Sequence, residues 1–130
     1  GCLPMAEAPV IAIVDDDEGV RTTLASLVRS LGYQARTYGS GADFLQQPSG
    51  EDPACMIADI QMPRMTGDEL QAKLVASGRS FPIIFMTAHP TEPVRKRVMA
   101  AGAYCYLGKP ASGDEIIRHL EGALAGHALR

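Results

Sequence analysis

The stretch Ile11-Ala12-Ile13-Val14-Asp15-Asp16-Asp17 decides the fold of this chain, because an apolar run ends there on three consecutive acidic residues. A short run of valine and isoleucine bounded by polar residues predicts a buried strand with the acids at its carboxyl end. Neighbouring carboxylates repel each other by about 4 kcal/mol per pair at an effective dielectric near 20. The cluster therefore indicates either a bound cation or a following helix that Asp17 caps. A helix cap accounts for one acid and leaves two unexplained.

Length and composition indicate one ordinary globular domain. The chain has 130 residues, of which 46% are hydrophobic and 21% are charged, a typical soluble composition. The formal charge of -3 argues against nucleic-acid binding by this domain, since such binding rests on clustered positive charge. We expect a disordered lead-in over residues 1–9, the domain over residues 10–126 and a tail over residues 127–130.

The chain carries no sign of membrane attachment or secretion. Its apolar runs are all shorter than the ~18 residues of a membrane span, and the N-terminus does not resemble a secretory signal. The three cysteines, Cys2, Cys55 and Cys105, lack the spacing of a metal site or a disulfide framework. We therefore expect a cytoplasmic protein.

Five apolar runs alternate with five amphipathic segments along the chain. The expected strands cover residues 11–14, 33–38, 54–58, 82–86 and 103–107, and the expected helices begin after Asp17 and at Ser40, Thr66, Thr91 and Ser112. Strands that are apolar on both faces and separated by helices predict an α/β fold with a parallel sheet between two helical layers. The expected buried stripes of the third and fourth helices are Leu70, Leu74 and Val75, and Val94, Val98 and Ala101.

Polar side chains follow the strands at the points where they end. The first strand is followed by Asp15, Asp16 and Asp17, the third by Asp59, the fourth by Thr87 and the fifth by Lys109. The carboxyl ends of parallel strands share one edge of the sheet, where ligands bind. Carboxylates without histidine or thiolate suit a hard cation, Mg²⁺ above all, and a lysine suits a phosphoryl oxygen.

These residues carry a family resemblance. The set Asp15-Asp16, Asp59-x-x-Met62-Pro63-x-Met65-x-Gly67, Thr87-Ala88 and Lys109-Pro110 resembles the receiver domain of two-component response regulators. The resemblance covers about Val10 to Gly126, nearly the whole chain. It implies a flavodoxin-like (βα)5 fold, doubly wound, with a five-stranded parallel sheet in the order 2-1-3-4-5.

The resemblance also assigns roles at the expected site. It implies that Asp59 is the phosphoacceptor and that a sensor histidine kinase or a histidine phosphotransfer protein is the donor. Mg²⁺ would be held by Asp15, Asp16, Asp59 and the backbone carbonyl of Gln61, and Lys109 would pair with the phosphoryl group. A cis peptide bond is implied between Lys109 and Pro110.

A second set of implied roles concerns the response to phosphorylation. Thr87 and Tyr106 would act as switch residues that alter the face built by the fourth helix, the fifth strand and the fifth helix. Ala88 and His89 would flank the phosphate, although His89 is equally well explained as a solvated loop residue. A phosphorylation-dependent homodimer is one form that the response would take.

Two questions about the output stay open at this point. The segment Thr87-Ala88-His89-Pro90-x-x-Pro93 resembles regulators of the nitrogen-fixation-response type, which carry a C-terminal DNA-binding domain and control transcription. A single-domain receiver that relays or drains phosphate is the alternative.

A different class, an aspartate-nucleophile phosphatase of the haloacid dehalogenase type, would use Asp15 and Asp17, but it needs a further acidic pair that Asp114 and Glu115 do not convincingly supply.

Overall fold

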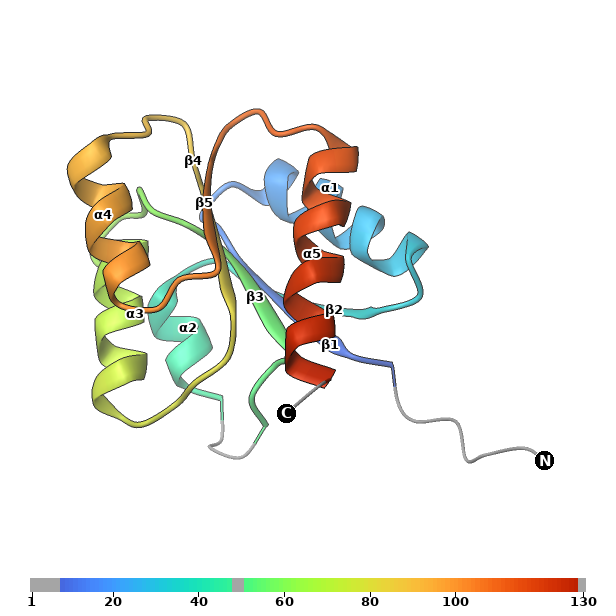
Figure 1. Ribbon diagram of the computed structural model, residues 1–130, viewed down its shortest axis with the longest axis horizontal. Helices are drawn as coiled ribbons and strands as arrows, with labels where there is room; N and C mark the ends of the chain where they lie inside the picture. The colour runs from blue at the N-terminus through green and yellow to red at the C-terminus, as the bar shows by residue number, and fades with distance from the viewer. Residues whose placement is uncertain (1–7, 48–50, 129–130) are drawn as a thin grey trace.

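The computed structural model describes residues 8–47 and 51–128 (Figure 1). In these ranges the chain alternates between strand and helix five times. The strands are β1 (Val10–Val14), β2 (Gln34–Tyr38), β3 (Cys55–Asp59), β4 (Ile83–Thr87) and β5 (Cys105–Gly108). The helices are α1 (Glu18–Ser30), α2 (Gly41–Leu45), α3 (Gly67–Ala76), α4 (Glu92–Ala100) and α5 (Gly113–Ala128).

The expected domain limits are only partly covered by these residues. Residues 1–7 of the expected lead-in and residues 129–130 of the expected tail lie outside the described ranges. At the other end, α5 continues to Ala128, two residues past the limit that we expected at residue 126. Nowhere in residues 8–47 and 51–128 does a helix have the length and apolar character needed to cross a membrane.

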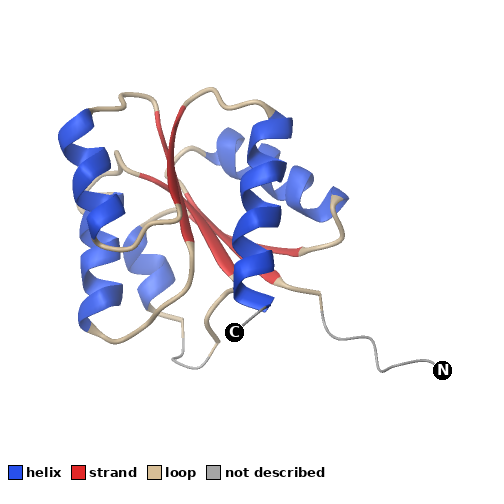
Figure 2. Ribbon diagram, in the orientation of Figure 1, coloured by secondary structure: helices blue, strands red, loops and turns tan. Residues whose placement is uncertain are grey.

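The five strands form one parallel sheet in the order β2-β1-β3-β4-β5, which confirms the flavodoxin-like fold. Helices α1 and α5 cover one face, and α2, α3 and α4 cover the other (Figure 2). Strands β3 and β4 are buried along their whole length, as is β1 except at Val10, because helices cover both faces of the sheet centre. The edge strand β2 is more exposed, which corrects the expectation that every strand is apolar on both faces.

Helix ends follow the local sequence signals. The Asp17 side chain caps α1 by accepting a hydrogen bond from the Val20 amide, and Thr66 and Glu69 form the reciprocal capping box of α3. Such caps satisfy amides that have no partner inside the helix. They fix where each helix starts and therefore where each preceding loop must turn.

Two predicted core positions are wrong. Val75 is 57% exposed, and Ala101 is exposed after the last turn of α4. The buried residues of α3 are Gly67, Leu70, Gln71 and Leu74. The polar Gln71 is therefore part of the buried face, and the apolar Val75 is not. The expected buried stripe of α3 rested on the spacing of its apolar residues alone. In the structure, α3 is turned so that a face including Gln71 packs inward.

Candidate functional site

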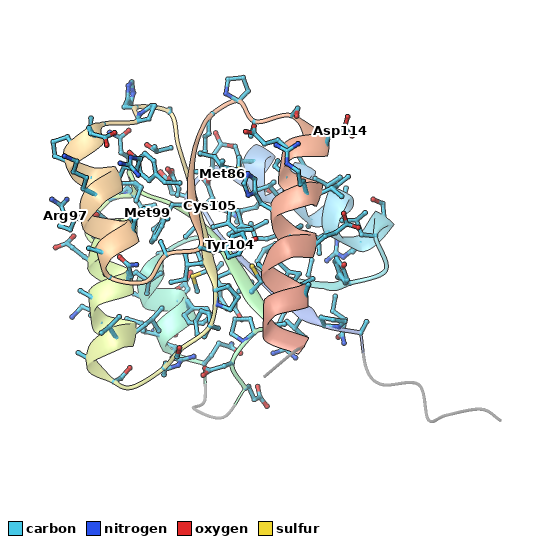
Figure 3. All side chains as sticks on the ribbon, viewed as in Figure 1. Met86, Arg97, Met99, Tyr104, Cys105 and Asp114 are labelled. Carbon is cyan, nitrogen blue, oxygen red and sulfur yellow. The ribbon has the colours of Figure 1, made fainter. Side chains whose placement is uncertain are left out.

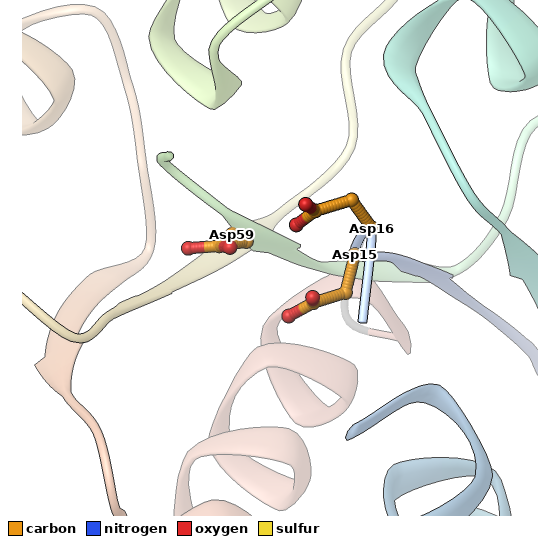
Figure 4. A group of neighbouring side chains, drawn as sticks. All are labelled: Asp15, Asp16 and Asp59. Carbon is orange, nitrogen blue, oxygen red and sulfur yellow. The ribbon is translucent and has the colours of Figure 1, made fainter. Parts of the chain in front are cut away.

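Three carboxylates meet at the carboxyl edge of the sheet. Asp15 and Asp16 follow β1, Asp59 ends β3, and one carboxylate oxygen of each lies within 4.8 Å of the others. Figure 4 shows the three carboxylates lying close to one another. Asp15 and Asp59 are buried and Asp16 is exposed. Two of the three carboxylates are therefore fixed inside the protein, and the third, that of Asp16, is open to solvent.

Backbone amides orient two of these acids. The Asp17 amide donates to Asp15 Oδ1 at 2.9 Å, and the Gln61 amide donates to Asp59 Oδ1 at 3.2 Å. Asp17 itself caps α1 and stays out of the cluster. The sequence left a helix cap and a cation site as alternatives for the three acids. In the structure, Asp17 caps α1, and Asp15 and Asp16 form a cluster with Asp59.

Lys109 supplies the positive charge of the site. Its Nζ lies 2.8 Å from Asp15 Oδ2 and 3.5 Å from Asp59 Oδ2. The peptide bond from Lys109 to Pro110 is cis, as the family resemblance implies. Partial burial opposes the charged form of Lys109, but the hydrogen bond and charge of Asp15, followed by those of Asp59, raise its pKa overall. Lys109 is therefore a fixed ammonium group between two carboxylates.

The electrostatic environment of Asp59 is unfavourable for its negative charge. Burial, which is the largest cause, and the charge of Asp15 raise the pKa of Asp59, while Lys109 and the Gln61 amide oppose that rise. Three acidic side chains share the cluster with a single ammonium, so acidic groups outnumber basic ones there. Oxygen donors without nitrogen or sulfur suit a hard divalent cation such as Mg²⁺, so the residues present fit a metal site of that kind.

The residues expected to respond to phosphorylation lie on β4, on β5 and in the loop after β4. Thr87 ends β4 with none of its surface exposed, and its Oγ1 accepts a hydrogen bond from the His89 amide at 3.2 Å. Ala88 and His89 are exposed in the loop that follows. Tyr106 is partly buried on β5, and its phenolic oxygen accepts a hydrogen bond from the Thr91 amide at 3.1 Å. Tyr106 thus contacts the start of α4.

Two contacts that shape the site had not been predicted. Arg21 donates from Nη1 to the backbone oxygen of Asp15 at 2.6 Å and so supports the turn after β1. A Cβ atom at Gly67 would lie 2.2 Å from the backbone oxygen of Asp59, so only glycine lets α3 begin this close to the end of β3. The motif containing Gly67 was visible in the sequence, whereas Arg21 was visible only as a cation off the apolar stripe.

The acidic residues that the phosphatase hypothesis requires are not brought together in the structure. Asp15 is bonded to Lys109 and to the Asp17 amide, and the Asp17 carboxylate is occupied by the cap of α1. Asp114 and Glu115 lie at the start of α5, and neither is part of the acidic cluster found among the described residues. The geometry therefore does not support the phosphatase hypothesis.

A doubly wound α/β domain with clustered carboxylates and a lysine at the carboxyl edge of its sheet has the parts of a phosphoacceptor domain. The model of the response regulator receiver domain family matches residues 11–121. The chain therefore belongs to the response regulator receiver domain family, whose members are phosphoacceptor switches of two-component signalling rather than conventional enzymes.

Curated relatives agree with this assignment. The chain is 36% identical over 115 residues to the response regulator protein TmoT of Ectopseudomonas mendocina, covering 88% of this chain and 52% of the relative. It is 34% identical over 124 residues to the transcriptional regulatory protein FixJ of Azorhizobium caulinodans, covering 95% and 59%. The expected similarity to the nitrogen-fixation-response type is confirmed. The chain spans about half the length of the curated relatives it matches.

Solved structures show the same fold. FixJ-N superposes with a TM-score of 0.83 at 30% identity, covering 92% of this chain and 96% of that one. The response regulator StyR gives a TM-score of 0.87 at 37% identity, covering 95% and 62%. In both cases the match extends over nearly all of this chain, so the whole fold is shared.

Proposed function

We propose that this domain accepts a phosphoryl group on Asp59 in a Mg²⁺-dependent reaction. The single observation that carries the proposal is the position of Asp59, which shares a cluster with Asp15 and Asp16 and lies 3.5 Å from the Lys109 ammonium. The donor would be a sensor histidine kinase or a histidine phosphotransfer protein. The family supports such a donor.

The metal would be held by Asp15, Asp16, Asp59 and the backbone carbonyl of Gln61. When bound, Mg²⁺ would offset the excess negative charge of the cluster and offer a coordination position to a phosphoryl oxygen. The exposed carboxylate of Asp16 leaves this side of the cluster accessible to solvent and ligand. The buried Asp15 is held in place by the Lys109 ammonium and the Asp17 amide.

Asp59 would act as the nucleophile. One of its carboxylate oxygens attacks the phosphorus of a phosphohistidine, a P–O bond forms and the P–N bond breaks. The imidazole leaves with the bonding electron pair and takes up a proton from solvent. Lys109 opposes the rise that burial and Asp15 cause in the pKa of Asp59, and it offers its ammonium to the incoming phosphoryl oxygens.

Thr87 and Tyr106 would transmit the modification to the face of α4, β5 and α5. The Thr87 hydroxyl would exchange its bond with the His89 amide for one with the phosphoryl group, with Ala88 and His89 flanking that group. Tyr106 would then change its contact with Thr91 at the start of α4. Such a shift between two states alters the surface that a partner or a second copy of the chain binds.

The natural output would be control of transcription in the cytoplasm, through a DNA-binding domain outside this sequence. Longer relatives, of which the match covers 59% and 56% and which are named transcriptional regulatory proteins, support this choice. The alternative is a receiver that only relays or drains phosphate. Replacing Tyr106 by alanine separates the two hypotheses, with association measured by sedimentation. If the domain switches an output, the replacement abolishes phosphorylation-dependent association. If the domain only relays phosphate, the replacement has no effect.

Incubation with acetyl phosphate and Mg²⁺, followed by intact mass, tests the proposed function. Wild type gains one phosphoryl group, and the gain is lost with EDTA or in Asp59→Asn. Asp114→Asn, which removes an exposed carboxylate outside the cluster, is the matched control and behaves as wild type. A gain in both wild type and Asp59→Asn, or in neither, contradicts the proposal.

A further inference from the structure

Gln71 is a buried polar side chain with no part in the candidate site. The described residues contain four buried polar or charged side chains, and the other three, Asp15, Asp59 and Thr87, belong to the site. Gln71 is 4% exposed on the inner face of α3. Burying an amide is costly unless it is hydrogen-bonded, so its partner indicates what the side chain does.

The partner is the C-terminal end of α4. Gln71 Nε2 donates to the backbone oxygen of Val98 at 2.9 Å. The same oxygen accepts the Ala103 amide at 2.9 Å, the Gly102 amide binds Met99 at 3.1 Å, and Gly102 has a positive φ of 106°. These bonds form a complete helix C-cap. The Gln71 bond is therefore not needed to finish α4, and its effect is to tie α4 to α3.

Apolar packing holds α4 weakly, which makes this tie important. Val98 is the one buried residue of α4, and Val94 and Met99 are only partly buried. A second tie joins the same two helices, since Arg97 Nη2 lies 2.8 Å from Asp68 Oδ2 at the start of α3. Figure 3 labels Arg97 and Met99 on this helix. Both polar ties act on the C-terminal half of α4.

The N-terminal end of α4 has a different anchor. The Thr91 amide, at the N-cap of α4, donates to the Tyr106 hydroxyl. A short exposed loop joins Thr91 to Thr87, whose hydroxyl faces the His89 amide. A change at the phosphoacceptor therefore reaches this end of the helix first, while the Gln71 tie holds the other end.

We propose that Gln71 is a positioning residue for the phosphorylation response, which fixes the C-terminal end of α4 on α3. The response that starts at Asp59 and Thr87 then swings the N-terminal end of α4 about this fixed end. The inference rests on the proposed function, because it assumes that Asp59 is phosphorylated. It identifies a residue that determines how α4 moves.

Hydrogen exchange read by mass spectrometry tests the inference. Gln71→Met keeps an unbranched side chain of similar length and removes the donor, and Ala72→Met places the same side chain at the exposed neighbouring position as a control. Each protein is measured with Mg²⁺, before and after acetyl phosphate, and intact mass records its phosphorylation. In wild type we expect exchange to change over residues 88–96 on phosphorylation and to stay constant over residues 98–103.

Gln71→Met should differ from both other proteins. Before phosphorylation, residues 98–103 exchange roughly twofold to tenfold faster, as expected for the loss of one hydrogen bond. After phosphorylation both ends of α4 respond, a change that a purely structural role of Gln71 would not produce. Equal exchange over residues 98–103 in Gln71→Met and Ala72→Met overturns the inference, as does a wild-type response that is the same at both ends.

A second variant covers a failure of Gln71→Met to fold. Asp68→Asn weakens the tie to Arg97 at a position outside the core, and it should accelerate exchange over residues 98–103 in the same direction by a smaller factor. No change in this variant then counts against the inference. Absence of a mass gain in wild type instead contradicts the proposed function, and the comparison before phosphorylation still reports on the tie.

Discussion

Helices α4 and α5 lie on opposite faces of the sheet and are held in different ways (Figures 1 and 2). Helix α5 buries Ile116, Leu120 and Ala123 in the core that it shares with α1. Helix α4 buries Val98 alone and depends on polar contacts at its two ends. Because α5 is anchored by apolar packing and α4 mainly by polar contacts at its ends, we expect α4 to be the more easily displaced of the two helices.

Core truncation should give the largest contrast between the two faces. Leu120→Ala removes a side chain with no exposed surface on α5 and should lower the free energy of unfolding by about 2–5 kcal/mol. Val94→Ala removes a half-buried side chain on α4 and should cost less than about 1 kcal/mol. Urea denaturation with a shared m-value measures both. Similar losses for the two variants would contradict a difference in anchoring.

A smaller effect is expected where α3 starts beside Asp59. Gly67→Ala places a Cβ against the backbone oxygen of Asp59, and the required shift should cost about 1–3 kcal/mol. Gly113→Ala at the start of α5 meets no atom within 4 Å and is the matched control, with a neutral or slightly stabilising effect. Thermal unfolding followed by circular dichroism compares the two. The close approach would be unimportant if Gly67→Ala were as stable as Gly113→Ala.

The smallest of these effects concerns the charge of Asp59. Burial and the Asp15 charge raise the pKa of Asp59 in the folded protein, so its ionised form opposes folding above that pKa. Without divalent cations, Asp59→Asn should raise the free energy of unfolding at pH 7 by about 0.5–2 kcal/mol. The gain should vanish below roughly pH 4, where the carboxyl is protonated in both states.

Asp114→Asn provides the control for this titration. Its carboxylate is exposed outside the cluster, so its removal should leave stability unchanged across the same pH range. Denaturation curves at several pH values, with EDTA present, follow both variants. A loss of stability in Asp59→Asn at pH 7 would mean that the Lys109 contact outweighs burial and the Asp15 charge.

The layered fold was predictable because its signals are local. Buried parallel strands require apolar runs, and a polar residue after each run marks the edge of the sheet, so Asp59, Thr87 and Lys109 could be placed before any coordinates. The sheet order came from the family resemblance. The contact between Lys109 and Asp15 spans 94 residues and does not follow from that order alone, because β3 and β4 lie between β1 and β5.

The errors arose where tertiary packing decides between neighbouring residues. On α3, hydrophobicity favoured Val75 over Gln71, but the buried face includes Gln71 because its amide finds a carbonyl on α4. Arg21 lies off the apolar stripe of the first helix, and its side chain reaches back to the Asp15 backbone. Both contacts depend on the position of a backbone oxygen outside the helix that carries the side chain, which no periodic pattern encodes.

Locating the phosphoryl group on the chain tests the central claim most directly. After incubation with acetyl phosphate and Mg²⁺, borohydride reduction converts an aspartyl phosphate to homoserine, and tandem mass spectrometry of the peptides identifies the residue. We expect homoserine at position 59 alone, in a Mg²⁺-dependent amount. Homoserine at position 15, 16 or 17, or at no position, would contradict it.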